Sequence, residues 1–432
     1  MIDTKPPQPP QRGTARSQNN QMRILFVSTN LPIPTNNGRA IRSLSIIGGL
    51  VSCGHEVTFL SFAGKSRPEM LYPLSSYCRE IDLLEWELTS FSQDSDYLGR
   101  IGSLVRRKAY SLERFRCEPM RLRIEQHLRA TPFDLLVCDS LYSLLNVPQT
   151  EIPIALNCHN VEHVIFKRYS SMETNLIRKC YAAVEAHLLQ DAEQHGCRRA
   201  TLAMVCSSYD RDLLRRLNAD LPIFVIPNSV DTDLFCPQPD IARGTKVLTL
   251  LFQGGMDWYP NQDAVEFFAH AILPLVRAEC PEVKFVVAGR NPPAYLVDKL
   301  SASNGVEFTG TVPDMRPYLS AAAVVVVPLR FGSGTRIKIL EACAAGKPVV
   351  STSIGAEGLE LENGKDISVA DSPEEFAHAV VALLRDPERR EAIGRSARSS
   401  IVQRYSHAVV RNNLEEVVSN FEKQNSLVES IQ

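Results

Sequence analysis

The sequence has 432 residues and lacks several features that would place it in a specialised class of protein. Its formal net charge is only -2, so it has neither the excess of basic charge typical of nucleic-acid binding nor that of an acidic scaffold. The longest apolar run extends from Ala321 to Val327, far short of the roughly 18 residues that a transmembrane helix needs. These absences predict a protein with no membrane span and no nucleic-acid partner.

Paired cysteines are also lacking. The 11 cysteines are scattered from Cys53 to Cys343 without C-x-x-C spacing, which is typical of reduced, buried thiols rather than of disulfides or a thiolate zinc site. Residues 1–21 carry several prolines among polar residues and no apolar stretch of a signal peptide, so they are predicted to form a disordered tail. The expectation is a cytoplasmic enzyme that starts at about Met22.

The length of the chain suits two domains of about 200 residues each. The first part alternates between a β-rich run at 23–28, a loop rich in Pro, Asn and Gly, a helical stretch at 41–51 and a strand at 55–60. This order indicates the start of a doubly wound parallel sheet. Further strands are predicted at 135–138, 154–157, 202–206 and 224–226. Residues 22–226 are therefore predicted to form a Rossmann-like domain.

A second alternating set follows residues 227–245, a stretch rich in Pro, Asn, Asp and Gly that is interpreted as a linker. Strands and helices alternate again over 246–407, with a helix predicted at 262–277, so this part is predicted to form a second Rossmann-like domain. Residues 408–432 are predicted to form a terminal helix with a frayed end. The fold class is α/β, with two Rossmann-like domains facing across a cleft. Such sheets bind ligands at the carboxyl ends of their strands.

The strongest motif is a strand followed by a glycine loop, with Gly334, and by a helix opening near Thr335. Backbone N–H groups and the dipole at this helix start form an anion site. Arg336 and Lys338 add cationic donors suited to a diphosphate. Glu341 shares a helix face with Lys338 and can accept hydrogen bonds from ribose hydroxyls. The stretch therefore predicts a site for a nucleoside diphosphate.

Three further glycines and a histidine are candidate site residues. Gly254 and Gly255 follow a predicted strand, where they either let the backbone approach the donor or simply form a turn. His159 follows a β-rich run, so it is expected at the carboxyl end of a strand, facing the cleft. Gly38 and Arg39 open the first helix, where they either approach the phosphates or the acceptor, or form a tight turn.

Together these segments resemble the retaining glycosyltransferases of family four, the "group 1" enzymes with the GT-B fold. The glycine loop resembles in particular the bacterial branch whose loop reads G-x-G-T-R-x-K-x-L-E-A. The resemblance covers about 22–405 in the right order. Its further matching segments are 34–39, 158–162, 227–233, 252–261 and 310–314.

The resemblance implies transfer of a hexosyl-type residue from a nucleoside diphosphate sugar to a hydroxyl of a glycan or lipid-linked saccharide. It further implies retention of configuration, no metal or other cofactor, and a setting in cell-surface polysaccharide or lipid-linked oligosaccharide assembly. His159 would contact the donor sugar, while Arg336 and Lys338 would stabilise charge on the leaving diphosphate. The first domain would bind the acceptor and the second the donor, and the terminal helix would pack back across the domains.

The sequence departs from the family pattern at two places. Ser333 stands where most of the wider family has a second Glu, eight residues before Glu341. No Arg or Lys occurs between Gly254 and Pro260, where the family commonly has both. Alternative functions are therefore a sugar-nucleotide epimerase or hydrolase on the same fold, and a non-catalytic nucleotide-binding relative.

Two other motifs imitate metal sites. Residues 159–163 read H-x-x-E-H, but His159 ends a strand, so it cannot share a helix face with His163, and a zinc site is not expected. Asn160 is interpreted either as the N-cap of a helix or as a residue that binds the ligand. Asp231 and Asp233 form a D-x-D pattern that an Asx turn explains better than a metal.

A basic stretch runs from Arg100 to Arg129, with nine Lys or Arg against three Glu. One interpretation is a solvated helical face. The other is peripheral contact with anionic lipid headgroups at the inner face of the membrane, which would suit a lipid-linked acceptor.

Overall fold

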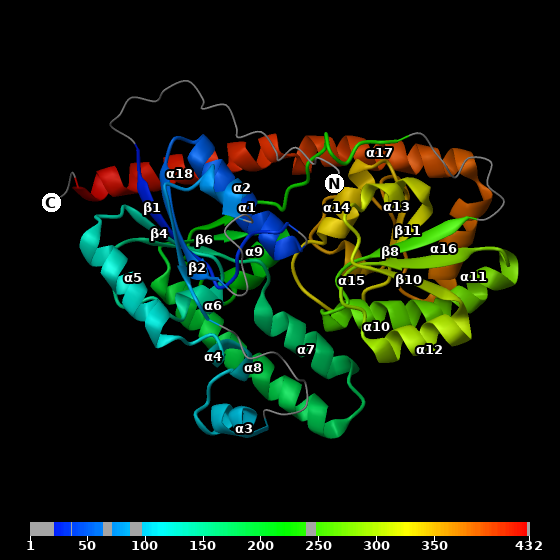
Figure 1. Ribbon diagram of the computed structural model, residues 1–432, viewed down its shortest axis with the longest axis horizontal. Coiled ribbons are helices and arrows are strands. Elements are labelled where there is room, and N and C mark those ends of the chain that lie inside the picture. Colours follow the sequence, from blue (N-terminus) through cyan, green and yellow to red (C-terminus); the bar gives the residue numbers. More distant parts are fainter. Residues whose placement is uncertain (1–20, 36, 64–70, 87–96, 239–247, 430–432) are drawn as a thin grey trace. The chain divides into compact units, whose positions relative to one another are not determined.

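The computed structural model describes residues 21–35, 37–63, 71–86, 97–238 and 248–429 (Figure 1). The chain forms two compact units: unit 1 is Met1–Pro227 with Val410–Gln432, and unit 2 is Asn228–Val409. Residues 1–20 of the predicted tail, and residues 239–247 of the predicted linker and the following strand, lie outside the described residues.

Unit 1 contains a seven-stranded sheet in the order β3-β2-β1-β4-β5-β6-β7. Neighbouring strands are all parallel, as the alternating sequence pattern predicts. The predicted strands at 135–138 and 154–157 are confirmed residue for residue. The strands are β1 (Arg23–Val27), β2 (Glu56–Phe62), β3 (Glu80–Leu84), β4 (Leu135–Cys138), β5 (Ile154–Asn157), β6 (Leu202–Val205) and β7 (Ile223–Val225).

Helices cover both faces of this sheet (Figure 1). Alternate residues of one strand point to opposite faces, so Phe26 of β1 joins a core with α1 and α18, while Leu25 joins a core with α5 and α7. The helices of unit 1 are α1 (Gly38–Ser52), α2 (Tyr72–Ser75), α3 (Tyr97–Val105), α4 (Tyr110–Glu113), α5 (Glu118–Ala130), α6 (Leu141–Leu144), α7 (Glu162–Met172), α8 (Leu176–Arg199), α9 (Ser208–Arg215) and α18 (His407–Glu429).

The last helix of the chain completes the core of unit 1. Val410, Leu414 and Phe421 of α18 are buried with the first strands of the sheet, hundreds of residues away in the sequence. The predicted C-terminal segment therefore belongs to the first Rossmann-like unit, and the chain crosses between the units twice.

Unit 2 contains a six-stranded parallel sheet in the order β10-β9-β8-β11-β12-β13. Its strands are β8 (Thr249–Gln253), β9 (Lys284–Ala288), β10 (Val306–Gly310), β11 (Ala322–Val327), β12 (Val349–Ser351) and β13 (Ser368–Val369). Its helices are α10 (Tyr259–Phe267), α11 (Leu273–Glu279), α12 (Ala294–Asn304), α13 (Arg316–Ala321), α14 (Ile337–Ala344), α15 (Ser353–Ala356), α16 (Pro373–Arg385) and α17 (Pro387–Tyr405). The helix predicted at 262–277 is divided by a π-helical turn at Phe268–Ile272.

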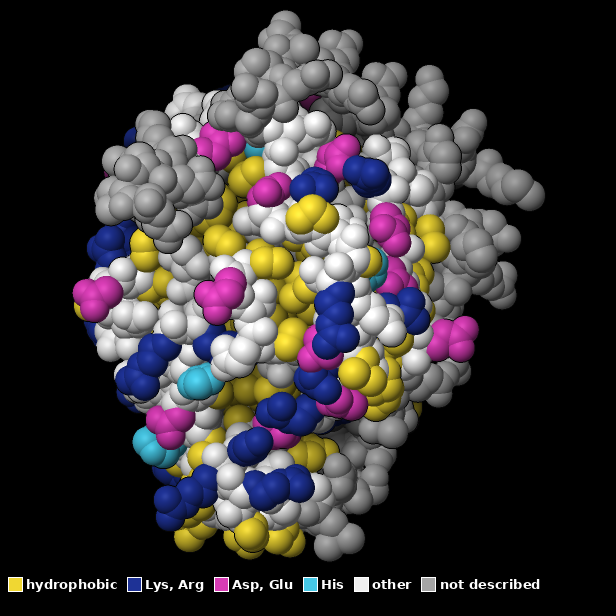
Figure 2. Space-filling view, turned by 90° about the vertical axis from the view of Figure 1, so that its left-hand side faces the viewer, with side chains coloured by type: hydrophobic (Ala, Val, Ile, Leu, Met, Phe, Trp, Pro, Cys, Tyr) yellow, Lys and Arg dark blue, Asp and Glu magenta, His cyan; other side chains and the backbone are white. Residues whose placement is uncertain are grey.

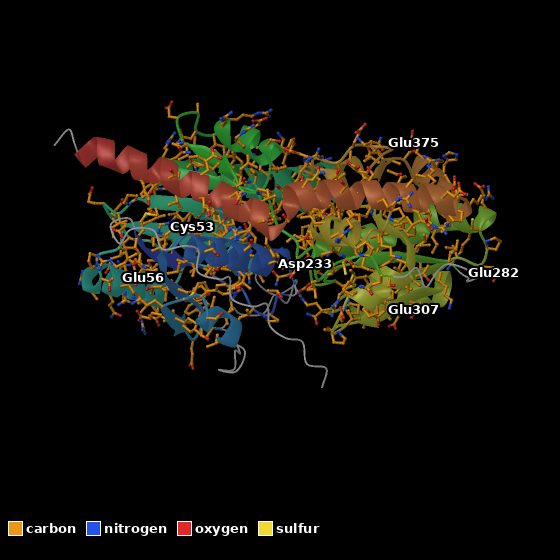
Figure 3. All side chains as sticks on the ribbon, turned by 90° about the horizontal axis from the view of Figure 1, so that it is seen from above. Cys53, Glu56, Asp233, Glu282, Glu307 and Glu375 are labelled. Atoms are coloured by element: carbon orange, nitrogen blue, oxygen red, sulfur yellow. The ribbon has the colours of Figure 1, made fainter. Side chains whose placement is uncertain are left out.

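Residues 228–238 are part of unit 2 and do not form a separate linker. Val230 is buried in the core of unit 2 and pairs with Ser406 in a β-bridge. Asp231 Oδ1 accepts hydrogen bonds from the backbone N–H groups of Asp233 (labelled in Figure 3), at 3.0 Å, and Leu234, at 2.8 Å. The D-x-D pattern is therefore an Asx turn, as expected.

Each sheet has one point where the strand order reverses. This point lies between β1 and β4 in unit 1, and between β8 and β11 in unit 2. Doubly wound sheets bind ligands outside the carboxyl ends of the strands at such a point. The predicted site residues follow β1 and β5 in unit 1, and β8 and β11 in unit 2.

Candidate functional site

The glycine loop of unit 2 connects β11 to α14 and is buried from Phe331 to Arg336. Two of its glycines have the positive φ that other residues rarely adopt: 141° at Gly332 and 75° at Gly334. Helix α14 begins at Ile337, two residues after the predicted start, and no side chain caps its N-terminus. The N-terminal amides of α14 can therefore serve an anion.

Arg336 lies folded back on its own loop. Its Nη1 atom donates to the backbone oxygens of Ser333 and Gly334, and its guanidinium lies 5.9 Å from the centre of the Trp258 ring. A Cβ atom at Gly332 would come within 2.7 Å of Arg336 Nη2, so glycine is required for this packing. Arg336 therefore shapes the loop as well as adding positive charge to it.

Lys338 is held at the end of β8 by Asn261. Its Nζ atom donates to Asn261 Oδ1 at 2.7 Å and lies 4.1 Å from the centre of the Phe252 ring. A Cβ atom at Gly254 would come within 2.8 Å of both Asn261 Nδ2 and Lys338 Nζ. Burial, and secondarily the charge of Arg336, hold the pKa of Lys338 well below its usual value. An anion bound here would raise this pKa and favour the charged form of Lys338.

Glu341 lies one turn beyond Lys338 on α14 and contacts the last residue of β8. Gln253 Nε2 donates to Glu341 Oε2 at 2.8 Å and to the backbone oxygen of Lys338 at 3.1 Å. Burial raises the pKa of Glu341 to about 7, although Lys338 and Gln253 lower it. Gln253 therefore orients the carboxylate expected to bind ribose.

Two other residues of the predicted donor site, Thr335 and Gly255, have structural partners. Thr335 Oγ1 accepts a hydrogen bond of 2.8 Å from Asn228 Nδ2, which ties the loop to the start of unit 2. The backbone oxygen of Gly255 accepts one of 2.7 Å from Asn261 Nδ2. Ser333, which replaces the family's second Glu, is buried. The structure thus brings together all the predicted donor residues of unit 2 at the ends of β8 and β11.

In unit 1, His159 is buried just beyond the end of β5, as predicted. Its Nε2 atom lies 2.8 Å from Asp139 Oδ1, so the ring donates to the carboxylate that follows β4. Burial holds the pKa of His159 below its usual value, although the carboxylate of Asp139 opposes this effect. Asp139 thereby fixes both the orientation and the tautomer of the ring.

Asp139 is the centre of a buried network. Its Oδ2 atom accepts from Ser28 Oγ at 2.8 Å and from Ser43 Oγ at 2.6 Å, and its Oδ1 atom also accepts from Asn157 Nδ2 at 2.7 Å. Burial alone would raise the pKa of Asp139, but His159 and the two hydroxyls lower it to about 2. The carboxylate is therefore ionised, and it joins the ends of three strands and helix α1.

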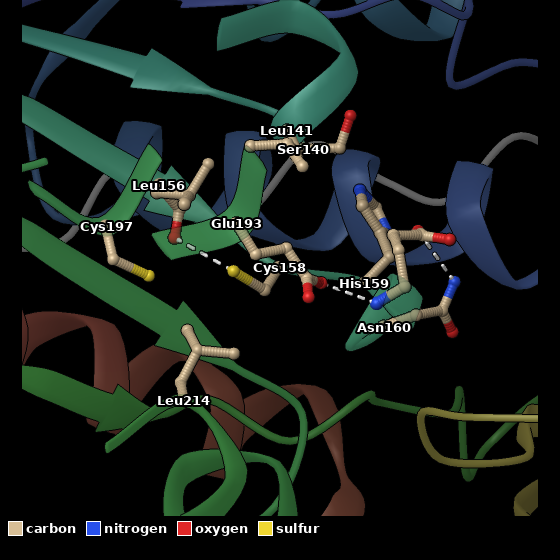
Figure 4. Close-up of a pocket in the computed structure, with 10 residues that line it drawn as sticks. Ser140, Leu141, Leu156, Cys158, His159, Asn160, Glu193, Cys197 and Leu214 are labelled. Carbon is tan, nitrogen blue, oxygen red and sulfur yellow. Dashed lines mark hydrogen bonds between the residues drawn. The ribbon is translucent and has the colours of Figure 1, made fainter. Parts of the chain in front are cut away.

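A small pocket lies beside His159 (Figure 4). Its wall includes Glu162 and Glu193, and Glu193 accepts hydrogen bonds from the backbone N–H of Glu162, at 2.6 Å, and from His163 Nδ1. His159 and His163 thus bind different carboxylates. No group of His, Cys, Asp and Glu among the described residues is placed to hold a metal ion. Helix α7 is preceded by Val161, so Asn160 is not its N-cap.

Gly38 is the exposed first residue of α1, just beyond the end of β1, and Asn37 Oδ1 caps the helix by accepting from Ala40 N at 2.9 Å. The Arg39 guanidinium lies 5.3 Å from the centre of the Tyr142 ring. Gly38 therefore lies at the carboxyl edge of the sheet that carries His159, but in a different unit from the other donor residues.

The basic stretch 100–129 spans α3, α4 and α5, and several of its cations on α5 and just before it have acidic partners. Arg121 pairs with Glu118 and Glu125, Arg116 with Glu113, and Arg123 with Asp82 of β3. This part of the stretch is therefore a solvated helical face whose charge is largely compensated.

The sequence pattern did not predict Asp139 or Gln253 as site residues, and Asn261 appeared only within the matching segment 252–261. Asp139 follows β4 directly and Gln253 ends β8. A polar residue at the carboxyl end of a strand next to the switch point was the available signal.

The fold, together with the polar residues Asp139 and Gln253 at the ends of β4 and β8, indicates the class of protein. The chain has a TM-score of 0.72 with sucrose-phosphate synthase from Thermosynechococcus elongatus, at 17% identity, covering 94% of this chain and all of that one. It has a TM-score of 0.61 with Alr3699/HepE of Anabaena in complex with UDP and glucose, at 16% identity over 92% of this chain and 100% of that one. The fold is GT-B, with two Rossmann-like units.

Family models match most of the chain. The model for "Glycosyltransferase Family 4" matches residues 37–234, and that for "Glycosyl transferases group 1" matches residues 248–386. The chain is thus a GT-B glycosyltransferase of the family 4 type.

Several curated proteins are similar in sequence. An uncharacterised 44.6 kDa protein in the cps region of Klebsiella pneumoniae is 22% identical, over 89% of this chain and 96% of its own length. The lipopolysaccharide core biosynthesis mannosyltransferase LpsB of Rhizobium meliloti is 24% identical over 47% of this chain and 67% of its own. The alpha-D-kanosaminyltransferase of Streptomyces kanamyceticus is 25% identical over 59% and 67%. Within the described part of the chain, no helix combines the length and apolar character of a membrane span.

Proposed function

We propose that the protein transfers a hexosyl residue from a nucleoside diphosphate sugar to a hydroxyl of a glycan or lipid-linked saccharide. The proposal includes retention of configuration and no requirement for a metal ion. The observation that carries it is the grouping of Lys338 and Glu341 on α14 with Gln253 at the end of β8 and Asn261 on α10. This group offers a cation and free amides to a diphosphate, and a carboxylate to the ribose one turn away.

In the proposed reaction, the bond between the anomeric carbon and the diphosphate oxygen breaks. A bond from the acceptor oxygen forms on the same face of the sugar, and the acceptor proton passes to the departing phosphate oxygen. Negative charge grows on the diphosphate while the sugar ring approaches an oxocarbenium ion. Lys338, Arg336 and the first amides of α14 would stabilise this negative charge in a site with little water.

His159 is proposed to contact the donor sugar and to help stabilise charge at its anomeric carbon. Its Nε2–H donates to Asp139, which fixes the orientation of the ring. Asp139 acts through His159 and is a positioning residue.

The named relatives support this type of reaction and suggest its setting. One is a mannosyltransferase of lipopolysaccharide core biosynthesis, and another belongs to a cps region. A solved relative was crystallised with UDP and glucose. We therefore propose a role in assembling cell-surface polysaccharide or lipid-linked saccharide on the cytoplasmic side of the membrane.

The test is a thermal-shift screen with UDP, GDP, ADP and CDP, each with and without EDTA. A nucleotide at 100 times its Kd stabilises the folded protein by roughly 2.7 kcal/mol. We expect one nucleotide to raise the melting temperature equally with and without EDTA. The shift should be lost in Glu341→Ala and kept in Glu307→Ala, a matched change of an exposed Glu in the same unit.

Absence of a shift with every nucleotide would refute the donor site and favour the non-catalytic alternative. Once the nucleotide is known, its glucose and mannose conjugates are incubated with and without saccharide acceptors, and products are separated by mass. Release of free sugar or an epimer without acceptor would identify the hydrolase or epimerase alternative. A product with the opposite anomeric configuration by NMR would refute retention alone.

A further inference from the structure

The loop after β8 carries a negative charge at the place where the donor diphosphate is expected. It contains Asp257 but no Arg or Lys between Gly254 and Pro260, where the family commonly has both cations. A carboxylate repels a diphosphate unless a neighbouring cation compensates its charge. The donor site therefore needs a further cation from another part of unit 2.

The end of the neighbouring strand β9 supplies such a cation. Arg290 is the second residue after β9, and its Nε and Nη2 atoms each lie 3.0 Å from Asp257 Oδ2. Because β8 and β9 are adjacent and parallel, the loops that follow them lie at the same edge of the sheet. Arg290 thus brings a guanidinium to the edge that carries the predicted donor residues.

Backbone contacts between the two loops fix the position of Arg290. Gly254 N donates to Ala288 O at 2.9 Å, and Met256 N donates to Arg290 O at 2.8 Å. A Cβ atom at Gly289 would come within 1.8 Å of the backbone oxygen of Gly254, so glycine is needed for the loops to lie this close. The backbone of Arg290 is therefore held directly beside the glycines that follow β8.

The charged groups of Asp257 and Arg290 both reach Gly255. A Cβ atom at Gly255 would lie 2.5 Å from Asp257 Oδ1 and 3.4 Å from Arg290 Cζ. At the preceding residue, a Cβ atom at Gly254 would lie 2.8 Å from Lys338 Nζ. Two cations therefore lie beside successive glycines, on the backbone that the donor is expected to approach, and Asp257 compensates the charge of one of them.

Neighbouring cations and carboxylates are common on protein surfaces, as the face drawn in Figure 2 shows. The Asp257–Arg290 pair differs by its place next to Gly255. The side chain of Arg290 is 24% exposed and that of Asp257 42%, so solvent reaches both groups. A pair with this exposure contributes little to stability. Another anion can therefore take the place of the carboxylate without loss of the fold.

We propose that Arg290 is a phosphate-binding residue of the donor site, and that the donor diphosphate replaces Asp257 as its partner. A guanidinium can bind phosphate oxygens through two parallel hydrogen bonds. Asp257 orients this guanidinium before the donor binds, and it competes with the diphosphate for the same N–H groups. The inference rests on the proposed function, because it assigns a residue to the diphosphate of the same donor.

The experiment is calorimetric titration with UDP, GDP, ADP or CDP, whichever binds the wild type, and with the matching nucleoside. Arg290→Met should weaken binding of the diphosphate by roughly 10- to 100-fold, because a charge-assisted contact is lost. Asp257→Asn should instead strengthen it by roughly threefold or more, because the competing negative charge is removed. The double variant should bind the diphosphate more tightly than Arg290→Met alone, because no uncompensated carboxylate is left. For the nucleoside, Arg290→Met should change the Kd by less than about twofold, because no phosphate is present.

The matched control is an ion pair at the other edge of the same sheet. Arg385 Nη1 lies 2.8 Å from Glu279 Oε2. Helix α11 ends at Glu279 shortly before β9 begins, so this pair lies at the amino edge, away from the donor residues. Arg385→Met and Glu279→Gln make the same changes of charge. Each should leave the Kd of the diphosphate within about twofold of the wild-type value, because solvent screens distant charges.

Three outcomes would overturn the proposal. Equal losses of affinity in Asp257→Asn and Arg290→Met would show a structural clamp, because either change breaks the pair. Equal losses for nucleoside and diphosphate in Arg290→Met would place the base or ribose at Arg290. Unchanged affinity in a folded Arg290→Met would remove this residue from the site.

Two further results complete the test. If Arg290→Met does not fold, weaker rather than tighter binding in Asp257→Asn overturns the proposal by itself. If no nucleotide binds the wild type, the donor site is refuted and this inference with it. The other outcomes leave the donor site in place, so the two failures are distinguishable.

Discussion

Replacing the carboxylate at the centre of unit 1 by the isosteric amide, Asp139→Asn, removes one charge and no volume. Asp139 accepts from Ser28, Ser43, Asn157 and His159. The two serine hydroxyls can turn to accept from an amide NH₂, since each also lies within 2.9 Å of a backbone oxygen. The variant should therefore fold, and what it loses is mainly the interaction of a buried negative charge with its donors.

The magnitude follows from the pKa of Asp139, which lies at about 2 in the folded protein against an ordinary value of 3.8. A pKa lower in the folded than in the unfolded state stabilises the fold above the unfolded value, and this stabilisation is lost as pH falls through the folded value. The difference amounts to about 2 kcal/mol of stability at about pH 7. At about pH 3 this stabilisation should be smaller by about 1 kcal/mol, because that pH lies below the pKa of the unfolded state and close to the pKa of the folded state.

The assay must report on unit 1 alone, because two units need not unfold together. The chain has two tryptophans, one in each unit: Trp86 beside Phe62, at 6.0 Å between ring centres, and Trp258 in unit 2. In a Trp258→Phe background, the fluorescence of Trp86 during urea unfolding gives the free energy of unit 1. Asp220→Asn, an exposed Asp of the same unit, is the matched control.

We expect Asp139→Asn to lower the free energy of unfolding of unit 1 by about 2 kcal/mol at about pH 7, with a smaller difference at about pH 3. Asp220→Asn should change it by less than about 0.5 kcal/mol. A loss for Asp139→Asn that is equally large at both pH values would show that shape and hydrogen bonding matter, not ionisation. No loss at either pH would refute the assignment of a buried carboxylate network.

Three further predictions concern unit 2. Gly254→Ala and Gly310→Ala both place a side chain at positive φ, at a cost of about 1–2 kcal/mol, but only at Gly254 does the new Cβ atom meet neighbours, at 2.8 Å. Nucleotide affinity, measured by calorimetry, should therefore fall in Gly254→Ala and persist in Gly310→Ala. A loss of affinity in both variants would contradict this reasoning. Lys338→Met should weaken nucleotide binding by roughly 10- to 100-fold, since a charge-assisted hydrogen bond is lost, and an unchanged Kd would remove Lys338 from the site. Gln253→Leu removes a hydrogen bond that lowers the pKa of Glu341, so this pKa should rise. If ribose binds the ionised carboxylate, the lower pH limit of nucleotide binding should then move upward. An unshifted pH profile of binding would contradict the role of Gln253.

Features set by short stretches of chain follow from the sequence by itself. The strand at 135–138, the glycine loop before α14 and the Asx turn at Asp231 depend on side chains within a few residues of one another. Hydrophobic alternation and glycine positions were therefore sufficient to predict two parallel-sheet units and to place His159 at a strand end. The same local chemistry was sufficient to set aside the H-x-x-E-H zinc pattern, because the strand ends before the helix begins.

The partners of these residues depended on the tertiary structure. Asp139 meets Ser28 across 111 residues of sequence, Gln253 meets Glu341 across 88, and Lys338 meets Asn261 across 77. The order of strands in each sheet decides which strand ends lie side by side. No local sequence pattern predicts that β1 neighbours β4 or that β8 neighbours β11. The same holds for α18, whose apolar face could have packed on either sheet but is buried in unit 1. Sequence therefore determined which groups stand at the strand ends, and the folded sheets decided which of them touch.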